Sequence, residues 1–352
     1  MTSDTTKRRF LPEWTVQSGV MLTWPHRHSD WQPWLSQVEP VFANIAFHIA
    51  TREQLLISCY DHDHRTHVER VLAQHGVKTD ATQCLIAPSN DTWARDHGPL
   101  TVAENGQHKL LDFTFNGWGG KYAAEHDNTL TLRLAAQGAF SDTSIESIDL
   151  VLEGGSVETD GQGTLLTTEA CLLSSTRNPD LSKREIEQQL TRHLGVRHFL
   201  WLKHGYLAGD DTDSHIDTLA RLCSPETLCY VRCTDQNDEH YSELKAMEAE
   251  LHTFRNQHGR PYRLVPLPMP QAKFNAQGDR LPATYANFLI INDAVLVPTY
   301  RDENDALALA QIARCFPRHK IVAIDCLPLI MQYGSLHCVT MQLPQGILEP
   351  RR

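Results

Sequence analysis

Four short clusters of polar residues interrupt the apolar pattern of this sequence, and their side chains are of types that can do chemistry. They are residues 91–99 (DTWARDHGP), 153–155 (EGG), 210–217 (DDTDSHID) and 334–338 (GSLHC). A thiol, imidazoles and several carboxylates are the groups that covalent catalysis and cation binding use. We expect each cluster to lie at the edge of a strand.

The spacing of His215 and Asp217 predicts that both lie on one face of a strand, with Ile216 buried behind them. A base and a carboxylate would then face the same pocket. The alternative is a histidine–aspartate pair on a solvated strand edge. For this pair taken alone, the alternative is favoured, because a single short motif is weak evidence.

Cys338 follows Gly334 and Ser335 and precedes an apolar run, so we expect it to begin a strand at a place where a ligand can approach the backbone closely. As a thiolate it would be a nucleophile. The alternative, a buried and inert thiol, is favoured for any one of the nine cysteines taken alone, because reactivity needs an electropositive environment.

Asp96 and Trp93 together offer a carboxylate and an indole face, which suit a cationic ligand. Two structural roles are equally open: Asp96 pairs with Arg95 or caps a turn, and Trp93 fills the core. Glu153 precedes two glycines, and it is either a solvated loop carboxylate or a buried one close to the backbone.

Metal-ligand residue types occur at close spacing in residues 61–67 (DHDHRTH). The run lies between a strand and a helix, so a solvated loop is the favoured interpretation. The cysteines are scattered singly without a C-x-x-C pair, which argues for reduced thiols and against a structural zinc site. We expect neither a metal nor an organic cofactor.

The composition is that of an ordinary globular protein, with 41% hydrophobic and 21% charged residues among 352. The net charge of −11 disfavours nucleic acid as a partner. No stretch is apolar enough for a membrane span, and residues 1–10 lack the apolar core of a secretory signal. We therefore expect a cytoplasmic protein without a membrane partner.

Short β-type runs and helical patterns alternate along the chain. The expected strands are 19–24, 54–60, 83–87, 109–115, 147–152, 163–168, 227–232, 262–267, 285–291, 294–298, 320–324 and 336–341, and the expected helices are 38–51, 65–75, 129–137, 182–194, 241–256 and 304–315. Ser182 and Glu185 predict a capping box. Strands outnumber helices, and no G-x-G-x-x-G follows a strand, so a doubly wound sheet is disfavoured. We expect a repeating unit of two or three strands and a helix in one domain, residues 1–352, with 1–12 and 344–352 peripheral.

Taken together and in this order, five segments resemble the agmatine deiminases of the guanidine-modifying, amidinotransferase-like superfamily. They are DTWARDHGP, EGGSVETDGQGTLLTTEACLLSSTRNP, GYLAGDDTDSHIDTLAR, LPATYANFLIIN and GSLHCVTMQ. The resemblance extends from about residue 20 to residue 342. It implies a five-bladed, pseudo-fivefold α/β propeller of ββαβ-type units around a central site.

The resemblance also implies roles for five residues. Cys338 matches the nucleophile, His215 the general acid and base, Asp96 and Asp217 the carboxylates that bind the guanidinium, and Glu153 a further acidic residue.

Three more residues are candidate substrate contacts. Trp93 matches an aromatic position beside the substrate, and the segment around Trp118 (FNGWGGKY) is also similar to the family. Asp211, in an acidic stretch with Asp210 and Asp213, would suit the distal ammonium of agmatine, although a solvated turn is an equal alternative.

The expected activity is deimination of agmatine to N-carbamoylputrescine and ammonia through a covalent S-alkylthiouronium on Cys338. The first alternative is a peptidyl-arginine or free-arginine deiminase on the same scaffold. The second is a non-catalytic module that binds polyamines or other cations. The expected partner is a small guanidinium substrate, and a homodimer is left open.

Overall fold

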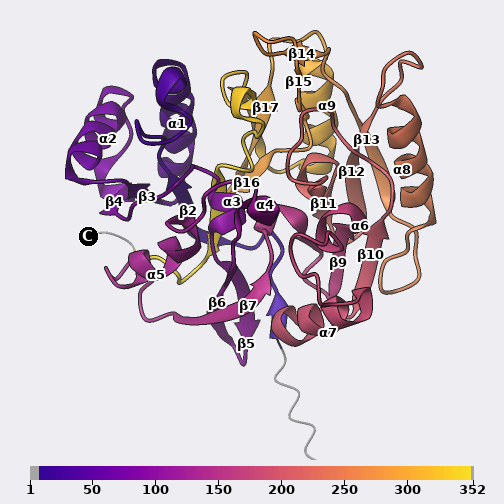
Figure 1. Cartoon of the computed structure of the whole chain (residues 1–352), viewed down its shortest axis with the longest axis horizontal. Coiled ribbons are helices and arrows are strands. Elements are labelled where there is room, and N and C mark those ends of the chain that lie inside the picture. Colours follow the sequence, from indigo (N-terminus) through magenta and orange to yellow (C-terminus); the bar gives the residue numbers. More distant parts are fainter. Residues whose placement is uncertain (1–7, 350–352) are drawn as a thin grey trace, which may run out of the picture.

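The computed structural model describes residues 8–349, in which strands and helices alternate (Figure 1). The strands are β1 (Arg8–Phe10), β2 (Gln17–Thr23), β3 (Gln54–Cys59), β4 (Thr82–Ile86), β5 (Leu100–Glu104), β6 (Gln107–Thr114), β7 (Ser144–Val151), β8 (Glu158–Thr159), β9 (Thr164–Thr168), β10 (His198–Leu202), β11 (Ala220–Ser224), β12 (Thr227–Arg232), β13 (Arg263–Pro268), β14 (Lys273–Phe274), β15 (Arg280–Leu281), β16 (Leu289–Ile291), β17 (Ala294–Thr299), β18 (Lys320–Asp325) and β19 (Thr340–Pro344). The α-helices are α1 (Leu35–Ala50), α2 (His62–Gln74), α3 (Ala94–His97), α4 (Gly117–Gly120), α5 (Leu130–Ala135), α6 (Glu169–Leu172), α7 (Lys183–Leu194), α8 (Tyr241–Thr253) and α9 (Asp305–Cys315).

One pairing pattern recurs in five of the sheets formed by residues 8–349. A middle strand pairs antiparallel with one neighbour and parallel with the strand that follows it after a helix. Strand β17, for example, is antiparallel to β16 and parallel to β18, and α9 connects β17 to β18. The same holds for β6, β9, β12 and β2, the last of which pairs with the C-terminal strand β19. The expected mixed α/β fold with a repeated ββαβ unit is therefore confirmed at the level of the single sheets.

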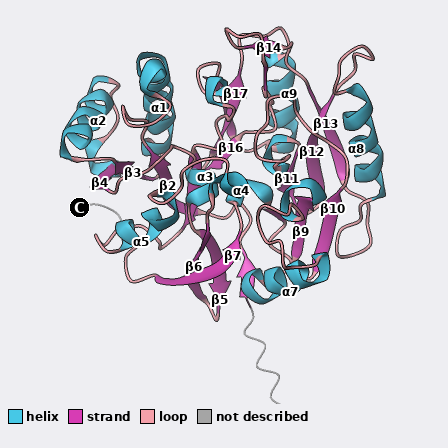
Figure 2. Ribbon diagram, viewed as in Figure 1, coloured by secondary structure: helices cyan, strands magenta, loops and turns pink. Residues whose placement is uncertain are grey.

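The long helices cover the outside of the molecule. In Figures 1 and 2, α1, α2, α7, α8 and α9 lie toward the periphery, whereas the short helices α3 and α4 lie near the centre. Helix α1 shows why: its residues Val38, Phe42, Ile45 and Ile49 recur at three- and four-residue spacing and are all buried. Residues 55–59 of β3 are buried without alternation, as expected for a strand covered on both faces.

Residues at both described ends of the chain pack into the fold more closely than expected. Strand β1 pairs antiparallel with β5, and Phe10 and Leu11 are buried. At the other end Ile347 and Leu348 are buried as well. The ends were expected to be peripheral; these four residues are buried, Arg9, Gln345, Gly346 and Glu349 are exposed, and residues 1–7 and 350–352 lie outside the described part. Among the described residues, no helix combines the length and the apolar character needed to cross a bilayer.

The predicted capping box at Ser182 is confirmed. The Ser182 side chain accepts a hydrogen bond from the backbone N–H of Glu185, and the Glu185 carboxylate accepts one from the backbone N–H of Ser182. Helix α7 ends at Gly195, which has a left-handed conformation (φ 75°), as is usual after a helix C-terminus.

Ser182→Ala should lower the free energy of unfolding by about 1 kcal/mol, because α7 loses a cap for its first turn. Urea denaturation checks this. Thr66→Ala, an exposed hydroxyl inside α2, is the matched control and should change the free energy by less than about 0.5 kcal/mol. Equal effects of the two substitutions would contradict the capping role.

Candidate active site

Each of the five recurring sheets is entered through an irregular turn, and these turns meet at the centre. Asp96 lies in α3 just before β5, Gly155 in the 3-10 helix η4 (Gly154–Ser156) before β8, and Asp217 in the 3-10 helix η5 (Ile216–Thr218) before β11. Asn287 precedes β16, and Cys338 precedes β19. Hydrogen bonds join them: the Gly155 N–H donates to Asp96 Oδ1 (2.9 Å), and the Asn287 amide donates to Asp217 Oδ2 (3.2 Å).

The prediction that His215 and Asp217 share the face of a strand is wrong. His215 is the N-cap residue of η5, and Asp217 lies inside this helix. A tight turn still brings both side chains to one cavity, and Ile216 is fully buried, as expected. The sequence spacing is compatible with either geometry, and only the tertiary structure selects the turn.

The prediction that Cys338 begins a strand is also wrong. Strand β19 begins at Thr340, and Cys338 lies in the preceding turn, where its carbonyl accepts a hydrogen bond from the N–H of Arg95 (3.0 Å). Gly334 lines the cavity, and it also has a role that was not expected. A Cβ at Gly334 would lie 2.2 Å from the Trp93 ring, so this glycine makes room for the indole.

Asp96 is a buried carboxyl group with two fixed donors. Trp118 donates from Nε1 to Asp96 Oδ2 (2.9 Å), and Gly155 donates to Oδ1. Burial and the negative charge of Asp217 raise the pKa of Asp96 well above its usual range, against the effect of these donors. His215 Nδ1 lies 3.6 Å from Asp96 Oδ1, but burial lowers the pKa of this imidazole to about 3, so it does not supply a positive charge near neutral pH.

Asp217 is buried too, but its pKa shifts in the opposite direction. Burial is the largest single influence and would raise the pKa. The hydrogen bond from His337 (2.7 Å to Oδ2) and the electrostatic effects of His337, His215 and Arg221 together outweigh it, so the pKa of Asp217 is lowered. Asp217 Oδ1 is buried without a hydrogen-bond partner. This oxygen is therefore free to accept a hydrogen bond from a ligand.

Cys338 and His215 are both buried in their uncharged forms. Burial, together with Asp217 and Asp96, raises the pKa of the Cys338 thiol well above its ordinary value. Its sulfur is 3.8 Å from Asp217 Oδ2 and 3.4 Å from Asn287 Oδ1. Burial lowers the pKa of His215 to about 3, although Asp217 opposes this shift. A thiol and a neutral imidazole therefore coexist near neutral pH.

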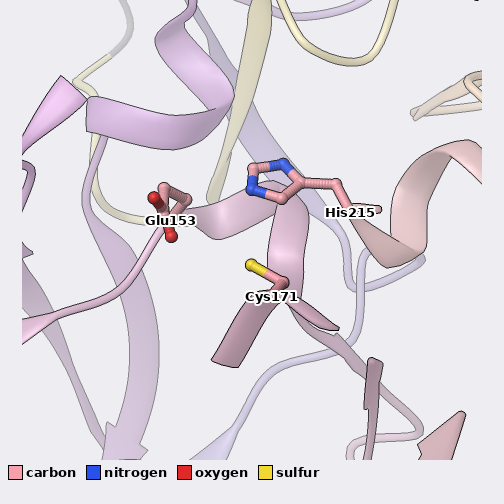
Figure 3. A group of neighbouring side chains, drawn as sticks. All are labelled: Glu153, Cys171 and His215. Atoms are coloured by element: carbon pink, nitrogen blue, oxygen red, sulfur yellow. The ribbon is translucent and has the colours of Figure 1, made fainter. Parts of the chain in front are cut away.

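Glu153 does not line the cavity but lies beside His215 (Figure 3). Ligand atoms of Glu153, Cys171 and His215 all lie within 4.8 Å of one another. Both Glu153 oxygens accept hydrogen bonds from Arg177 Nε (2.8 and 3.0 Å). The guanidinium of Arg177 disfavours a divalent cation at this group, and Glu153 is best described as an acidic neighbour of the imidazole.

The cavity beside these residues has about 510 Å³ of empty space, part of which is open to solvent. Six of its lining residues are aspartates, namely Asp30, Asp91, Asp96, Asp210, Asp211 and Asp217. Among the described residues that line it there is no lysine or arginine. Burial raises the pKa values of Asp91 and Asp210 to about 6, so both are mostly ionised at neutral pH. The cavity therefore attracts cations and repels carboxylates.

Both candidate tryptophans line this cavity. Trp93 contacts Trp31 with ring centroids 5.7 Å apart. Trp118 has a positive φ of 55°, a conformation uncommon for a bulky residue, and in it the indole donates to Asp96. The two indoles thus hold an apolar surface next to the carboxylates.

In the acidic stretch 210–213, some carboxylates are engaged in contacts within the protein, whereas another can still bind a ligand. Asp210 accepts bonds from the Thr212 hydroxyl and the Ser214 N–H, and Asp213 pairs with Arg177 and Lys121. Asp211 accepts one bond from the Tyr122 hydroxyl (2.8 Å) and lines the cavity. Asp211 is therefore the member of the stretch that remains suited to a ligand.

The histidine-rich run 61–67 is the beginning of α2 and not a loop, contrary to expectation. Asp61 caps this helix by accepting a bond from the N–H of His64. Both ring nitrogens of His64 are engaged with backbone groups, the N–H of Tyr60 and the carbonyl of Pro25. Asp61 and His64 therefore have structural roles in this part of the fold.

Several residues that build the site were not predicted from the sequence. Asn287 contacts both Asp217 and Cys338, and Arg177 binds Glu153. Asn287 lies within the expected strand 285–291, of which only Leu289–Ile291 is extended. The only sequence signal for Asn287 was its polar side chain within this apolar run. The sequence gives no comparable signal for a role of Arg177 in the site.

The overall fold defines the class of this protein. An amidinotransferase from Microseira wollei shares it with a TM-score of 0.51 at 12% identity, over 98% of this chain and 99% of that one. At this identity the likeness concerns the fold alone, and it relates the chain to amidinotransferase folds.

The chain belongs to the family of Porphyromonas-type peptidyl-arginine deiminases, whose model matches residues 9–344. A Porphyromonas gingivalis structure described as "Putative Arginine Deiminase" is 51% identical, with a TM-score of 0.91 over 97% of this chain and 100% of that one. An agmatine deiminase from C. jejuni, solved with substrate bound in a cysteine-to-serine variant, is 34% identical, with a TM-score of 0.90 over 99% of each chain. A relative from Vibrio parahaemolyticus named "Putative agmatine deiminase" is 34% identical over 95% of this chain and 96% of its own length. The resemblance to guanidine-modifying deiminases is confirmed.

Gly155→Ala should lower kcat/KM for a guanidinium substrate by about 100-fold or more, because misplacement of reacting groups by about 1 Å costs that much. The new Cβ would lie 2.7 Å from His215 Nδ1 and 2.8 Å from Asp96 Oδ1. Steady-state kinetics check this. Gly76→Ala is the control: its φ of 69° is unfavourable for alanine, but no atom lies within 4 Å of the new Cβ, so it should cost stability and leave kcat/KM unchanged. A fully active Gly155→Ala variant would contradict the close approach at this position.

Proposed function

We propose that this protein is an agmatine deiminase, which hydrolyses agmatine to N-carbamoylputrescine and ammonia. The observation that carries the proposal is the cavity with Cys338 and His215 on its wall, six aspartates around it and no lysine or arginine among the described lining residues. Agmatine carries a positive charge at each end. The C. jejuni relative supports the proposal because it is an agmatine deiminase with substrate bound.

Asp96 and Asp217 would hold the guanidinium. A carboxylate can accept paired N–H bonds from a guanidinium, so two of them neutralise and orient it at once. The ligand supplies the positive charge that these buried groups lack. At an effective dielectric constant of 20, opposite charges about 4 Å apart attract by about 4 kcal/mol, and 1.36 kcal/mol corresponds to one pKa unit. A bound cation can therefore lower the pKa of Cys338 by about three units.

The chemistry then proceeds through a covalent intermediate. The Cys338 thiol gives its proton to His215, and the sulfur bonds to the guanidinium carbon, forming a tetrahedral adduct. The carbon–nitrogen bond breaks as His215 returns the proton to the leaving nitrogen, so ammonia departs and an S-alkylthiouronium remains. Water then gives a proton to His215 and adds to the carbon. The carbon–sulfur bond breaks as the C–OH of the adduct becomes the carbonyl and its proton passes to solvent. His215 returns its proton to the Cys338 sulfur, and N-carbamoylputrescine leaves. No step calls for a metal or an organic cofactor.

The other candidate residues would bind and shape the substrate. Trp93 and Trp118 would flank the alkyl chain, and Asp211 would bind the distal ammonium. Glu153 would act through His215 as a negative neighbour that favours the protonated imidazole when it forms. These roles follow from the position of each residue.

Arginine is the substrate of the leading alternative. A free-arginine or peptidyl-arginine deiminase is favoured by the family description and by the P. gingivalis relative. Free arginine, however, brings a carboxylate, and the six cavity aspartates would repel it. A non-catalytic cation-binding module is the second alternative, in which the thiol is idle.

Proposals also remain about the whole molecule. The five sheets with one pairing pattern, and the turns that meet at Asp96, Gly155, Asp217, Asn287 and Cys338, support a pseudo-fivefold propeller around the site. We further propose that residues 1–352 form a single domain, that the protein resides in the cytoplasm, and that a homodimer is its simplest assembly.

Ammonia release is measured with agmatine, arginine and a blocked arginyl peptide as substrates. Agmatine should have the highest kcat/KM by at least about 100-fold. Its distal ammonium gains a charge pair with Asp211, and it has no carboxylate for the aspartates to repel, which together are worth several kcal/mol. Cys338→Ala should abolish the release, whereas Cys84→Ala, at a partly buried thiol that does not line the cavity, should retain it. Turnover that ranks arginine first would favour the alternative deiminase. Agmatine binding without turnover in the wild-type protein would favour the binding module.

A further inference from the structure

A cluster of charged and polar side chains lies beside Asp217 and takes no part in the proposed chemistry. Its members are Glu13, Arg95, Glu158, Arg221, His337 and Gln342. None of them lines the cavity that contains Cys338. Except for Glu13, which is partly exposed, all are buried. A charged cluster of this kind is costly to bury and calls for a role.

The imidazole of His337 lies between two carboxylates. Its Nδ1 is 2.7 Å from Asp217 Oδ2, and its Nε2 is 2.7 Å from Glu13 Oε1. A doubly protonated ring satisfies both contacts. Burial, with Arg221 and Arg95, lowers the pKa of His337, so the second proton is held weakly. In the neutral tautomer that carries its proton on Nδ1, Nε2 can accept from Arg221 (3.0 Å), and Nδ1 donates to Asp217 as it does in the doubly protonated ring.

Glu13 reaches this ring from the segment between β1 and β2. Its carboxylate is 2.5 Å from Arg221 Nη2 and 3.2 Å from Arg95 Nη1. Burial would raise the pKa of Glu13, but Arg221, His337 and Arg95 outweigh it and hold the pKa well below its usual range. Glu13 lines a separate cavity with Arg95 and Gln342, so it acts on the substrate through His337 and not by contact.

We propose that His337 is a positioning residue that orients Asp217 and keeps it ionised for the guanidinium, and that Glu13 fixes the His337 ring from the opposite side. This inference rests on the proposed agmatine deiminase activity. His337 and Asn287 both donate to Asp217 Oδ2, so they fix the carboxylate plane and leave Oδ1 for the ligand. Through Glu13, the segment between β1 and β2 thus helps to position the active-site carboxylate Asp217.

The direction of the pH effect follows from the groups that face Asp217. These groups are His337, His215, Arg221, Asp96, Cys338 and Asn287. Burial raises the pKa of Asp217, and His337 supplies two of the effects that oppose burial, a hydrogen bond and an electrostatic attraction. Without His337, only His215 and Arg221 of these groups would still lower this pKa, so it should rise. A protonated Asp217 cannot pair with a cation. Guanidinium binding would then be lost at a higher pH as the solution is acidified.

Two substitutions at one position separate the hydrogen bond from the rest of the ring. His337→Ala removes the donor, and it should raise KM for agmatine about 10- to 100-fold near neutral pH, because the lost bond is to a charged group. The acidic limb of its kcat/KM profile should move up by about one pH unit or more. The shorter amide of His337→Asn can still donate to Asp217, so this variant should recover most of the KM and the wild-type limb.

Glu13→Gln tests the second half of the proposal. It keeps the shape but removes the charge that holds the ring, so the acidic limb should move in the same direction as in His337→Ala and by less. Glu158→Gln is the matched control: this buried carboxylate binds Arg221 but not His337. It should lower thermal stability and leave the acidic limb in place.

The possible failures are distinct. If the wild-type protein does not deiminate agmatine, the proposed function itself is wrong. If the wild-type protein is active and His337→Ala gives a superimposable pH profile and KM, only the role of His337 is overturned. The same outcome in Glu13→Gln alone overturns the role of Glu13. Equal losses in His337→Ala and His337→Asn, with the acidic limb unmoved, would mean that the ring serves packing only.

Discussion

The organisation of this site depends on the repulsion between two buried carboxyl groups that have no positive partner in the cavity. Asp96 and Asp217 face the same thiol, and the described residues that line the cavity add more carboxylates but no lysine or arginine. Burying such an arrangement is unfavourable for the free protein, because each charge loses hydration. A cationic ligand relieves the penalty, so binding and ionisation of the site are coupled.

Hydrogen bonds from several separate turns hold the two carboxyl groups close together. Each recurring sheet supplies one short turn to the centre, and each turn has its own backbone or side-chain hydrogen bonds. Asp96 is held by Trp118 and Gly155, whereas Asp217 is held by Asn287 and His337. The carboxylates therefore cannot rotate apart to escape one another, which is the preorganisation that a planar cation needs.

Much of this arrangement could be predicted from the sequence, and the remainder depended on long-range contacts. The helices and most strands follow from apolar periodicity, and the resemblance identified Cys338, His215, Asp96 and Asp217, all of which line one cavity. Periodicity failed at the turns, where His215 and Cys338 were assigned to strands. Strand β11 was missed because its buried Arg221 is stabilised by Glu13 and Glu158, which lie far away in the sequence. The roles proposed for His337 and Asn287 likewise depend on contacts that local sequence does not encode.

The central claim is that the ligand's own charge ionises Cys338, and alkylation by two reagents tests it most directly. The rate for neutral iodoacetamide reports the thiolate of the free protein, whereas cationic 2-chloroacetamidine brings a positive charge with it. Relative to a free thiol, Cys338 should react slowly with iodoacetamide up to a pH well above the ordinary thiol pKa and rapidly with chloroacetamidine near neutrality. Rapid reaction with iodoacetamide near neutral pH, with no preference for the cation, would show that the thiolate forms without a ligand and would contradict the account.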